Sequence, residues 1–194
     1  MASKDELALL MVMKILHVET TAMMKPFTLK HKFDPVEVRG LIGNFGVTIP
    51  VRFDTSIEPK AQYQSHPTSM LRVRFTDAFS LALQSLIIHE ATHAFCDKMK
   101  FNMDVGQSES MAYIAQCQFA QLRTIVGGNR LTEGDGDGTG DDAVFDVGWR
   151  LSGKLLAGTL RDLSPRDISD MRTAVNQHRY YKDKVDLPAV FDGV

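Results

Sequence analysis

Two histidines and a glutamate within five residues form the part of this sequence best suited to chemistry. His89 and His93 are four residues apart, and Glu90 directly follows the first of them. On a helix, residues four apart lie on the same face, so the two imidazoles could bind one zinc ion together. Glu90 is rotated by about a third of a turn, near enough to reach a water at that ion without binding the ion itself. The spacing therefore predicts a zinc centre with its own general base.

A catalytic zinc typically has three protein ligands, so the two histidines need a third partner. The pentapeptide His-Glu-Ala-Thr-His at 89–93 resembles the signature of the zincin hydrolases, and the resemblance covers about Leu86 to Gln116. In the gluzincin class of zincins the third ligand is a glutamate on a following helix. The resemblance therefore implies Glu109 as the third zinc ligand, with Tyr113 one turn further along the same face and close to the metal.

Other zincin classes provide an alternative and an exclusion. One class takes an aspartate at a similar distance after the second histidine, and Asp104 stands at that distance here. The metzincin class is excluded, because Cys96 and Met99 occupy the positions where it needs glycine and a third histidine. Cys96 lies one turn beyond the second histidine and could approach the metal, although a small buried core residue is the preferred interpretation.

The sequence offers several groups that could support the metal ligands. A zinc-bound histidine normally donates its second N–H to a carboxylate or a carbonyl group. Gluzincins often place an acidic residue one turn after the ligand glutamate, but Tyr113 stands there. Asp77, Asp97, Asp104 or a backbone carbonyl could take that role. His178 could stabilise an oxyanion in the transition state, and a satisfied core histidine is the alternative interpretation.

A second group of candidate ligands lies in the glycine- and aspartate-rich segment Asp135–Asp146. Its carboxylate and hydroxyl oxygens fit a loose calcium-loop template, with Gly140 at the sixth position and Asp146 at the twelfth. The twelfth residue is aspartate rather than glutamate, and Asp142 stands where an apolar residue normally packs. We therefore keep Ca²⁺ binding as an alternative to a solvated flexible loop.

The segments ahead of the motif mix helix and strand patterns. Pro50 indicates that the first strand is an edge strand. We expect, in order, a helix over Asp5–Glu19, an irregular linker over Met23–Pro35, a strand over Gly46–Phe53, a loop over Asp54–Ser69 and a half-exposed strand over Met70–Phe75.

From the motif onwards the sequence predicts helices. The segment Ala78–Met99 is apolar almost all round, so its polar motif needs partners from neighbouring elements. We expect Thr76 to cap this helix and Ser108 to cap the next, which would end at Gly127-Gly128. Two more helices follow, one over Asp142–Leu156 and one that starts at Ser164 and Pro165. Residues 1–194 are expected to form one helix-dominated, zincin-like α+β domain with a small sheet beside the motif helix.

Composition limits the partners of the chain. A formal net charge of −2 argues against binding to nucleic acid. The longest apolar runs are too short to span a membrane, and the start of the chain lacks the pattern of a secretory signal. Two cysteines form no disulfide framework, so we expect a cytoplasmic protein. The oligomeric state is not encoded in any pattern.

Peptide hydrolysis is the reaction that these residues would serve best. Glu90 would activate a water at the zinc ion, with Tyr113 and His178 helping to stabilise the transition state. A strand ahead of the motif helix, Leu71–Phe75, could bind an extended peptide or protein substrate by strand addition. The alternative is a non-catalytic, metal-binding zincin scaffold that acts as a protein-interaction or effector module.

Overall fold

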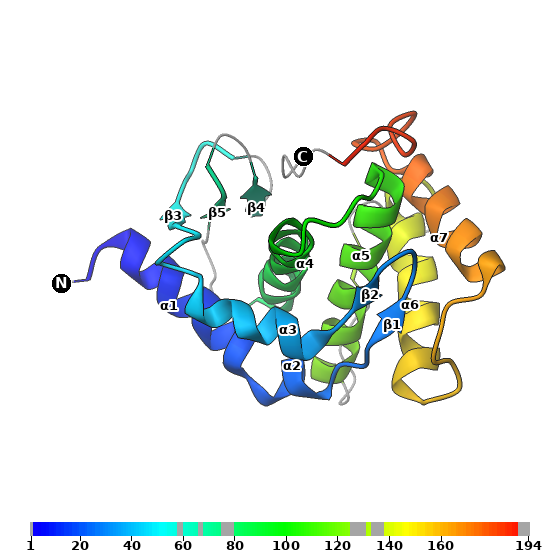
Figure 1. Ribbon diagram of the computed structural model, residues 1–194, viewed down its shortest axis with the longest axis horizontal. Coiled ribbons are helices and arrows are strands. Elements are labelled where there is room, and N and C mark those ends of the chain that lie inside the picture. The colour runs from blue at the N-terminus through cyan, green and yellow to red at the C-terminus, as the bar shows by residue number, and fades with distance from the viewer. Residues whose placement is uncertain are drawn as a thin grey trace.

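The computed structural model describes residues 2–57, 60–65, 68–74, 80–124, 131–132 and 138–189. Helices dominate these ranges and are joined by two small sheets, which confirms the predicted helix-dominated α+β class. The central element packs against one strand of a three-stranded sheet and, on another side, against the first of three successive helices, which itself packs against the other two (Figure 1). This central element is α4 (Leu81–Lys98), and the three helices are α5 (Val105–Arg123), α6 (Ala143–Leu156) and α7 (Pro165–Gln177).

The N-terminal part begins with the expected helix and then departs from the expected linker. Ser3 and Glu6 form a reciprocal capping box at the start of α1 (Lys4–His17). The linker prediction for Met23–Pro35 is wrong, because Phe27 and Phe33 stack at 4.9 Å and close a short hairpin. The elements of this part are α1, α2 (Glu19–Met23), β1 (Phe27–Thr28), β2 (Lys32–Phe33), α3 (Pro35–Gly40) and the 3-10 turn η1 (Leu41–Gly43).

The three-stranded sheet has the order β3 (Val51–Phe53), β5 (Met70–Val73), β4 (Ala61–Gln64). β3 lies at one edge, where Pro50 placed it, although the strand is shorter than expected. β4 lies inside the segment expected to be a loop, so that prediction is wrong. Its pairing with β5 supplies the hydrogen bonds that an isolated stretch with this weak alternation would lack.

The two helices that carry the motif begin at residues other than those expected. Ser80 caps α4 by accepting the N–H of Leu83, whereas the expected cap, Thr76, lies outside the described residues. Asp104 caps α5 with a capping box, one turn before the expected cap Ser108. The Ser108 prediction is wrong because the Asp104 carboxylate accepts the N–H of Gln107 at 2.8 Å, which leaves the serine hydroxyl free to bond elsewhere.

The C-terminal helices agree with the sequence prediction. η2 (Gly140–Asp142) leads into α6, and Ser164, Pro165 and Asp167 start α7 as a capping box with proline at its first position. A buried apolar cluster runs from α1 through the sheet and α4 to α7. In the part of the chain that the structure describes, none of the helices has the length and apolar character needed to cross a bilayer.

Candidate metal centre

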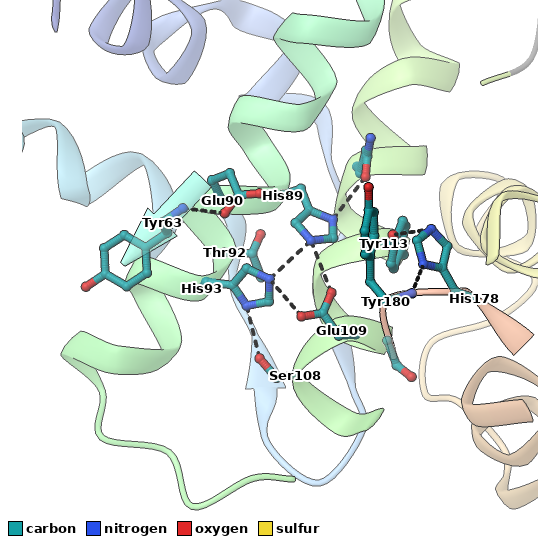
Figure 2. A network of polar contacts seen from close by, with 12 residues as sticks. Tyr63, His89, Glu90, Thr92, His93, Ser108, Glu109, Tyr113, His178 and Tyr180 are labelled. Atoms are coloured by element: carbon teal, nitrogen blue, oxygen red, sulfur yellow. Dashed lines mark hydrogen bonds and ion pairs between the residues drawn. The ribbon is translucent and has the colours of Figure 1, made fainter. Parts of the chain in front are cut away.

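Two neighbouring helices bring together the three residues predicted as metal ligands. α4 supplies His89 and His93 on its face toward α5, and α5 supplies Glu109. All three side chains are buried, with at most 6% of the residue exposed. Figure 2 shows the two imidazole rings and the carboxylate turned toward one another. This buried group could hold a metal ion.

The nitrogen and oxygen atoms of the three side chains are close enough together to contact one metal ion. Nε2 of His89 lies 3.1 Å from Nε2 of His93. The Glu109 carboxylate places one oxygen 3.3 Å from His89 Nε2 and the other 3.4 Å from His93 Nε2. Nitrogen and oxygen ligands at zinc distances of about 2.0–2.1 Å in a tetrahedron are about 3.3 Å apart. The site therefore has the size of a zinc centre, although it does not by itself identify the metal.

One oxygen of the cluster lacks a hydrogen-bond partner, and a cation could bind it. Glu109 Oε2 is buried and makes no hydrogen bond, although it faces His89 Nε2. A buried carboxylate oxygen without a partner is costly. The donor set of two imidazoles and one carboxylate, with this orphaned oxygen among them, therefore fits a divalent cation.

The second nitrogen of each histidine is held by a neutral side chain of α5. His89 Nδ1 donates to Gln116 Oε1 at 3.0 Å, which leaves the Nε2 lone pair facing the cluster. His93 Nδ1 lies 3.0 Å from the hydroxyl of Ser108. The expectation of an aspartate in this role is wrong for Asp97 and Asp104, which bond to other groups, while Asp77 lies outside the described residues.

Charges inside the cluster are strongly coupled. Burial alone would raise the pKa of Glu109, but the adjacent histidines, His93 foremost, outweigh burial and hold that pKa well below its usual range. Burial alone would lower the pKa of His93, and the Glu109 carboxylate reverses this and raises it. Each of the two groups therefore favours the charged form of the other.

Glu90 projects from α4 toward the sheet rather than toward α5 (Figure 2). Its Oε2 accepts the backbone N–H of Tyr63 on β4 at 2.6 Å. Burial raises the pKa of Glu90, and the two histidines and this N–H offset the rise only in part. The carboxyl group is therefore a better base than an exposed glutamate.

Three tyrosines and His178 lie on the α5 side. The ring of Tyr113 meets the ring of His89 edge-on at 4.6 Å. His178 is fully buried, and its Nε2 lies 3.5 Å from the Tyr113 hydroxyl. Its Nδ1 accepts the N–H of Tyr180 at 3.4 Å, so Nε2 carries the proton. Burial raises the pKa of Tyr181 well above its usual value, which keeps this hydroxyl protonated.

A cavity of about 660 Å³ opens onto the motif. His89 and Glu90 line it from α4, and Tyr113 lines it from α5, whereas His93 and Glu109 are not part of this lining. His178 is also absent from the lining, so it can act on a molecule in the cavity only through its neighbours, such as Tyr113.

The structure separates the remaining candidate ligands from the cluster. Asp104 accepts hydrogen bonds from Gln107 and from Arg172, the latter at 2.7 Å, and is not part of the cluster. Cys96 is buried with its sulfur 3.7 Å from that of Met111, and burial raises the pKa of the thiol to about 12. Cys96 is therefore a core residue, and Asp104 is a helix cap.

The calcium-loop prediction falls largely outside the described residues. Asp135 and Asp137 are not described. Asp141 binds Arg179, accepting the backbone N–H at 2.7 Å, and Asp146 lies in the first turn of α6. Ca²⁺ binding therefore stays a prediction.

The prediction that the segment Leu71–Phe75 binds a substrate by strand addition is wrong. Hydrogen bonds to β3 on one side and β4 on the other pair β5 along both edges, so the segment Leu71–Phe75 has no edge to offer within its described part. β4 is the strand of this sheet that faces α4, and Ala61 and Gln62 line the cavity. Strand β4, rather than the predicted segment Leu71–Phe75, therefore borders the motif.

The sequence interpretation missed Ser108 and Gln116 as partners of the two histidines, and also missed Tyr63 and Tyr181. A helical pattern could have shown one of these, because Glu109, Tyr113 and Gln116 follow the i, i+4, i+7 spacing of a single helix face. Tyr63 bonds to Glu90 through its backbone, so its residue type carries no signal. The comparisons with known proteins add no relative, since no family model, curated protein or solved structure matches the chain.

Proposed function

We propose that this chain is a zinc-dependent hydrolase, and within that class a metallopeptidase of the zincin type. The observation that carries the proposal is the buried group of His89, His93 and Glu109, which offers one ligand atom from each residue within 4.8 Å of the others, a donor set that zinc favours. The glutamate inside the motif, Glu90, lines the same cavity as His89.

Zinc bound there would polarise a substrate carbonyl and lower the pKa of a water molecule toward neutrality. Glu90 would then take a proton from the attacking water and deliver it to the leaving amine. Its raised pKa and its place in the cavity lining support this role. The N–H of Tyr63 would keep the carboxylate oriented, because it bonds to one oxygen and leaves the other available.

Hydroxyl groups on the α5 side would stabilise the charge that develops on the carbonyl oxygen. Tyr113 and Tyr181 both line the cavity, and a protonated phenol can donate a hydrogen bond to an oxyanion. His178 supports the first of these from behind, through the 3.5 Å contact with its hydroxyl. It would act as a positioning residue rather than touch the substrate.

The substrate would be a peptide or protein segment that lies along β4. This strand pairs with β5, and its residues Ala61 and Gln62 line the cavity beside Glu90. An extended peptide is the ligand that a strand beside a cleft binds most readily. The two free, buried cysteines are in keeping with a cytoplasmic location.

Zinc binding and hydrolysis are tested separately. Purified protein should contain one zinc ion per chain by elemental analysis, and saturating zinc at a hundred times the dissociation constant should raise the free energy of unfolding by about 2.7 kcal/mol. His89→Ala should lose both effects. His17→Ala, which removes an exposed histidine of α1, is the matched control and should keep them.

Hydrolysis is tested with Glu90→Gln on a fluorogenic peptide library. This variant should retain zinc but lose at least about a hundredfold in kcat, because it keeps the shape and removes the base. Equal cleavage by the variant and the wild type would contradict the mechanism. Stoichiometric zinc without cleavage by the wild type would instead support the non-catalytic, metal-binding scaffold.

A further inference from the structure

One wall of the cavity is basic. Lys60, Arg72 and Arg74 all line it, from β4 and β5 and the residues beside them. Antiparallel pairing places Gln62 opposite Arg72, and the bond from the N–H of Arg74 to the carbonyl of Lys60 continues this register. Directly opposite residues share a face of a sheet, so the three cations lie on one face, next to the strand that borders the motif.

The other lining residues differ in character from the three cations. Among the described residues of the lining, Glu90 is the only carboxylate, so cations outnumber anions by three to one. The chain as a whole has a formal net charge of −2, so this excess of positive charge is local. Leu86, Leu131 and Phe145 also line the cavity and give it an apolar surface.

One residue of the basic wall, Arg72, is held in place by hydrogen bonds. Two nitrogens of Arg72 donate to the carboxylate of Asp54, at 2.6 and 2.9 Å, and a third donates to Gln62 at 3.3 Å. Asp54 does not line the cavity, so this ion pair fixes the guanidinium from outside. The ammonium of Lys60 is exposed, and it can move to meet a charged group.

We propose that the cavity selects peptides that carry an acidic side chain, seated against Lys60 and Arg74, with an apolar side chain nearby. This inference rests on the proposed peptidase function and names its substrate class. A carboxylate beside these cations makes charge-assisted hydrogen bonds, which are about twice as strong as neutral ones. A cleft lined by one sign of charge also concentrates ligands of the opposite sign. A lysine at the same position of the peptide meets like charges instead.

Binding to the inactive variant Glu90→Gln, loaded with zinc, tests the inference without turnover. The probes are three dye-labelled peptides that share one leucine and differ at one nearby position, which is glutamate, glutamine or lysine. Fluorescence anisotropy should show that the glutamate peptide binds about tenfold more tightly than the glutamine peptide, and that the lysine peptide binds most weakly. Raising the ionic strength to about 1 M should remove most of the difference, because the Debye length falls to about 3 Å.

Charge-matched variants locate the effect. Adding Lys60→Gln and Arg74→Gln should reduce the preference for glutamate to less than about twofold, and the single change Lys60→Gln should reduce it in part. Lys30→Gln with Arg161→Gln changes the net charge equally at exposed positions outside the cavity lining and should keep the preference. Arg74→Lys, which keeps the charge, should also keep it.

The outcomes separate this inference from the proposed function. Equal binding of the three peptides, or a preference that survives the loss of both cavity cations, would overturn the inference even if the wild type cleaves peptides. A preference for glutamate that depends on Lys60 and Arg74 supports it. Failure of the wild type to cleave any of the three would then count against hydrolysis alone.

Discussion

Each histidine of the candidate metal centre uses Nδ1 for a partner on α5 and turns Nε2 toward Glu109. The partners are the amide of Gln116 and the hydroxyl of Ser108, both neutral. A carboxylate in this position would make the imidazole a stronger ligand, so neutral partners orient the rings without adding charge. Glu109 is therefore the one carboxylate among the three candidate ligands.

Removing one of these partners should weaken zinc binding specifically. Ser108→Ala deletes the group that orients His93, and we expect zinc affinity to fall by about tenfold to a hundredfold, as measured by competition with a chelating dye. Ser110→Ala is the matched control, because this buried hydroxyl on the same helix bonds to the carbonyl of Gly106. Both changes should cost about 1 kcal/mol of stability, and only the first should alter zinc affinity. Equal affinities in the two variants would contradict the assigned role of Ser108.

At the level of elements, the candidate metal centre depends on how closely the neighbouring helices approach α5. Glu109, Tyr113 and Gln116 all lie on this helix, which packs against α4 on one side and α6 on another. Gly148 of α6 lies where a Cβ atom would come within 2.9 Å of the sulfur of Cys117 on α5. The absence of a side chain at Gly148 therefore allows the close packing that positions α5.

Adding a methyl group at that contact should disturb the packing. We expect Gly148→Ala to lower the free energy of unfolding by about 1–3 kcal/mol, because the inserted Cβ overpacks a buried contact. Gly153→Ala on the same helix is the control, since its nearest neighbour, a side-chain atom of Gln121, is 3.6 Å away. The control should be neutral or gain up to about 1 kcal/mol from helix propensity. Urea unfolding of both variants measures the difference in the free energy of unfolding. An equal loss of stability in the two would contradict the role of the close contact between Gly148 and Cys117.

At the scale of the whole molecule, segments near the two ends of the chain are attached to the elements around the candidate site. Asp5 of α1 accepts the N–H of Phe53 at 2.8 Å and binds Arg52, which attaches the N-terminal helix to the sheet. At the other end, the carbonyls of Val185 and Leu187 accept the first N–H groups of α5. The segment that follows α7 thus completes the capping of the helix that carries Glu109.

Carboxylates at such junctions make the molecule sensitive to acid. Hydrogen bonds from Ser56 and from Arg72 lower the pKa of Asp54 from 3.8 to about 2. The unfolded chain then binds a proton more readily than the folded one, so the stabilisation from Asp54 is complete above pH 3.8 and is lost as the pH falls through about 2. The side chain is partly exposed to solvent, so the effect should be small.

Asp54→Asn provides the corresponding measurement. The wild type should be more stable than the variant at neutral pH, and the difference should shrink as the pH falls below 3.8. Thermal unfolding over this pH range, followed by circular dichroism, checks the trend. A difference that stays constant down to pH 2 would contradict it.

The motif and the buried helix that carries it could be proposed from residue types and spacing, because a helix places residues four apart on one face whatever surrounds it. The choice of Glu109 over Asp104 came from the resemblance to gluzincins. The helix-dominated α+β class and the Ser164 cap also followed from local patterns, which short-range hydrogen bonds decide. These are properties of single elements.

The tertiary structure alone decided which groups surround the motif. Asp104 rather than Ser108 caps α5, so the hydroxyl of Ser108 can bond to His93. Which of these two nearby residues caps the helix is not evident from the local sequence. Strand β4 and the bond from Tyr63 to Glu90 depend on backbone pairing between distant segments, which side-chain patterns do not record. Local sequence therefore determined which candidate ligand residues the chain contains and on which helices they lie. Long-range packing determined which groups orient these residues, bury them and border the cavity beside them.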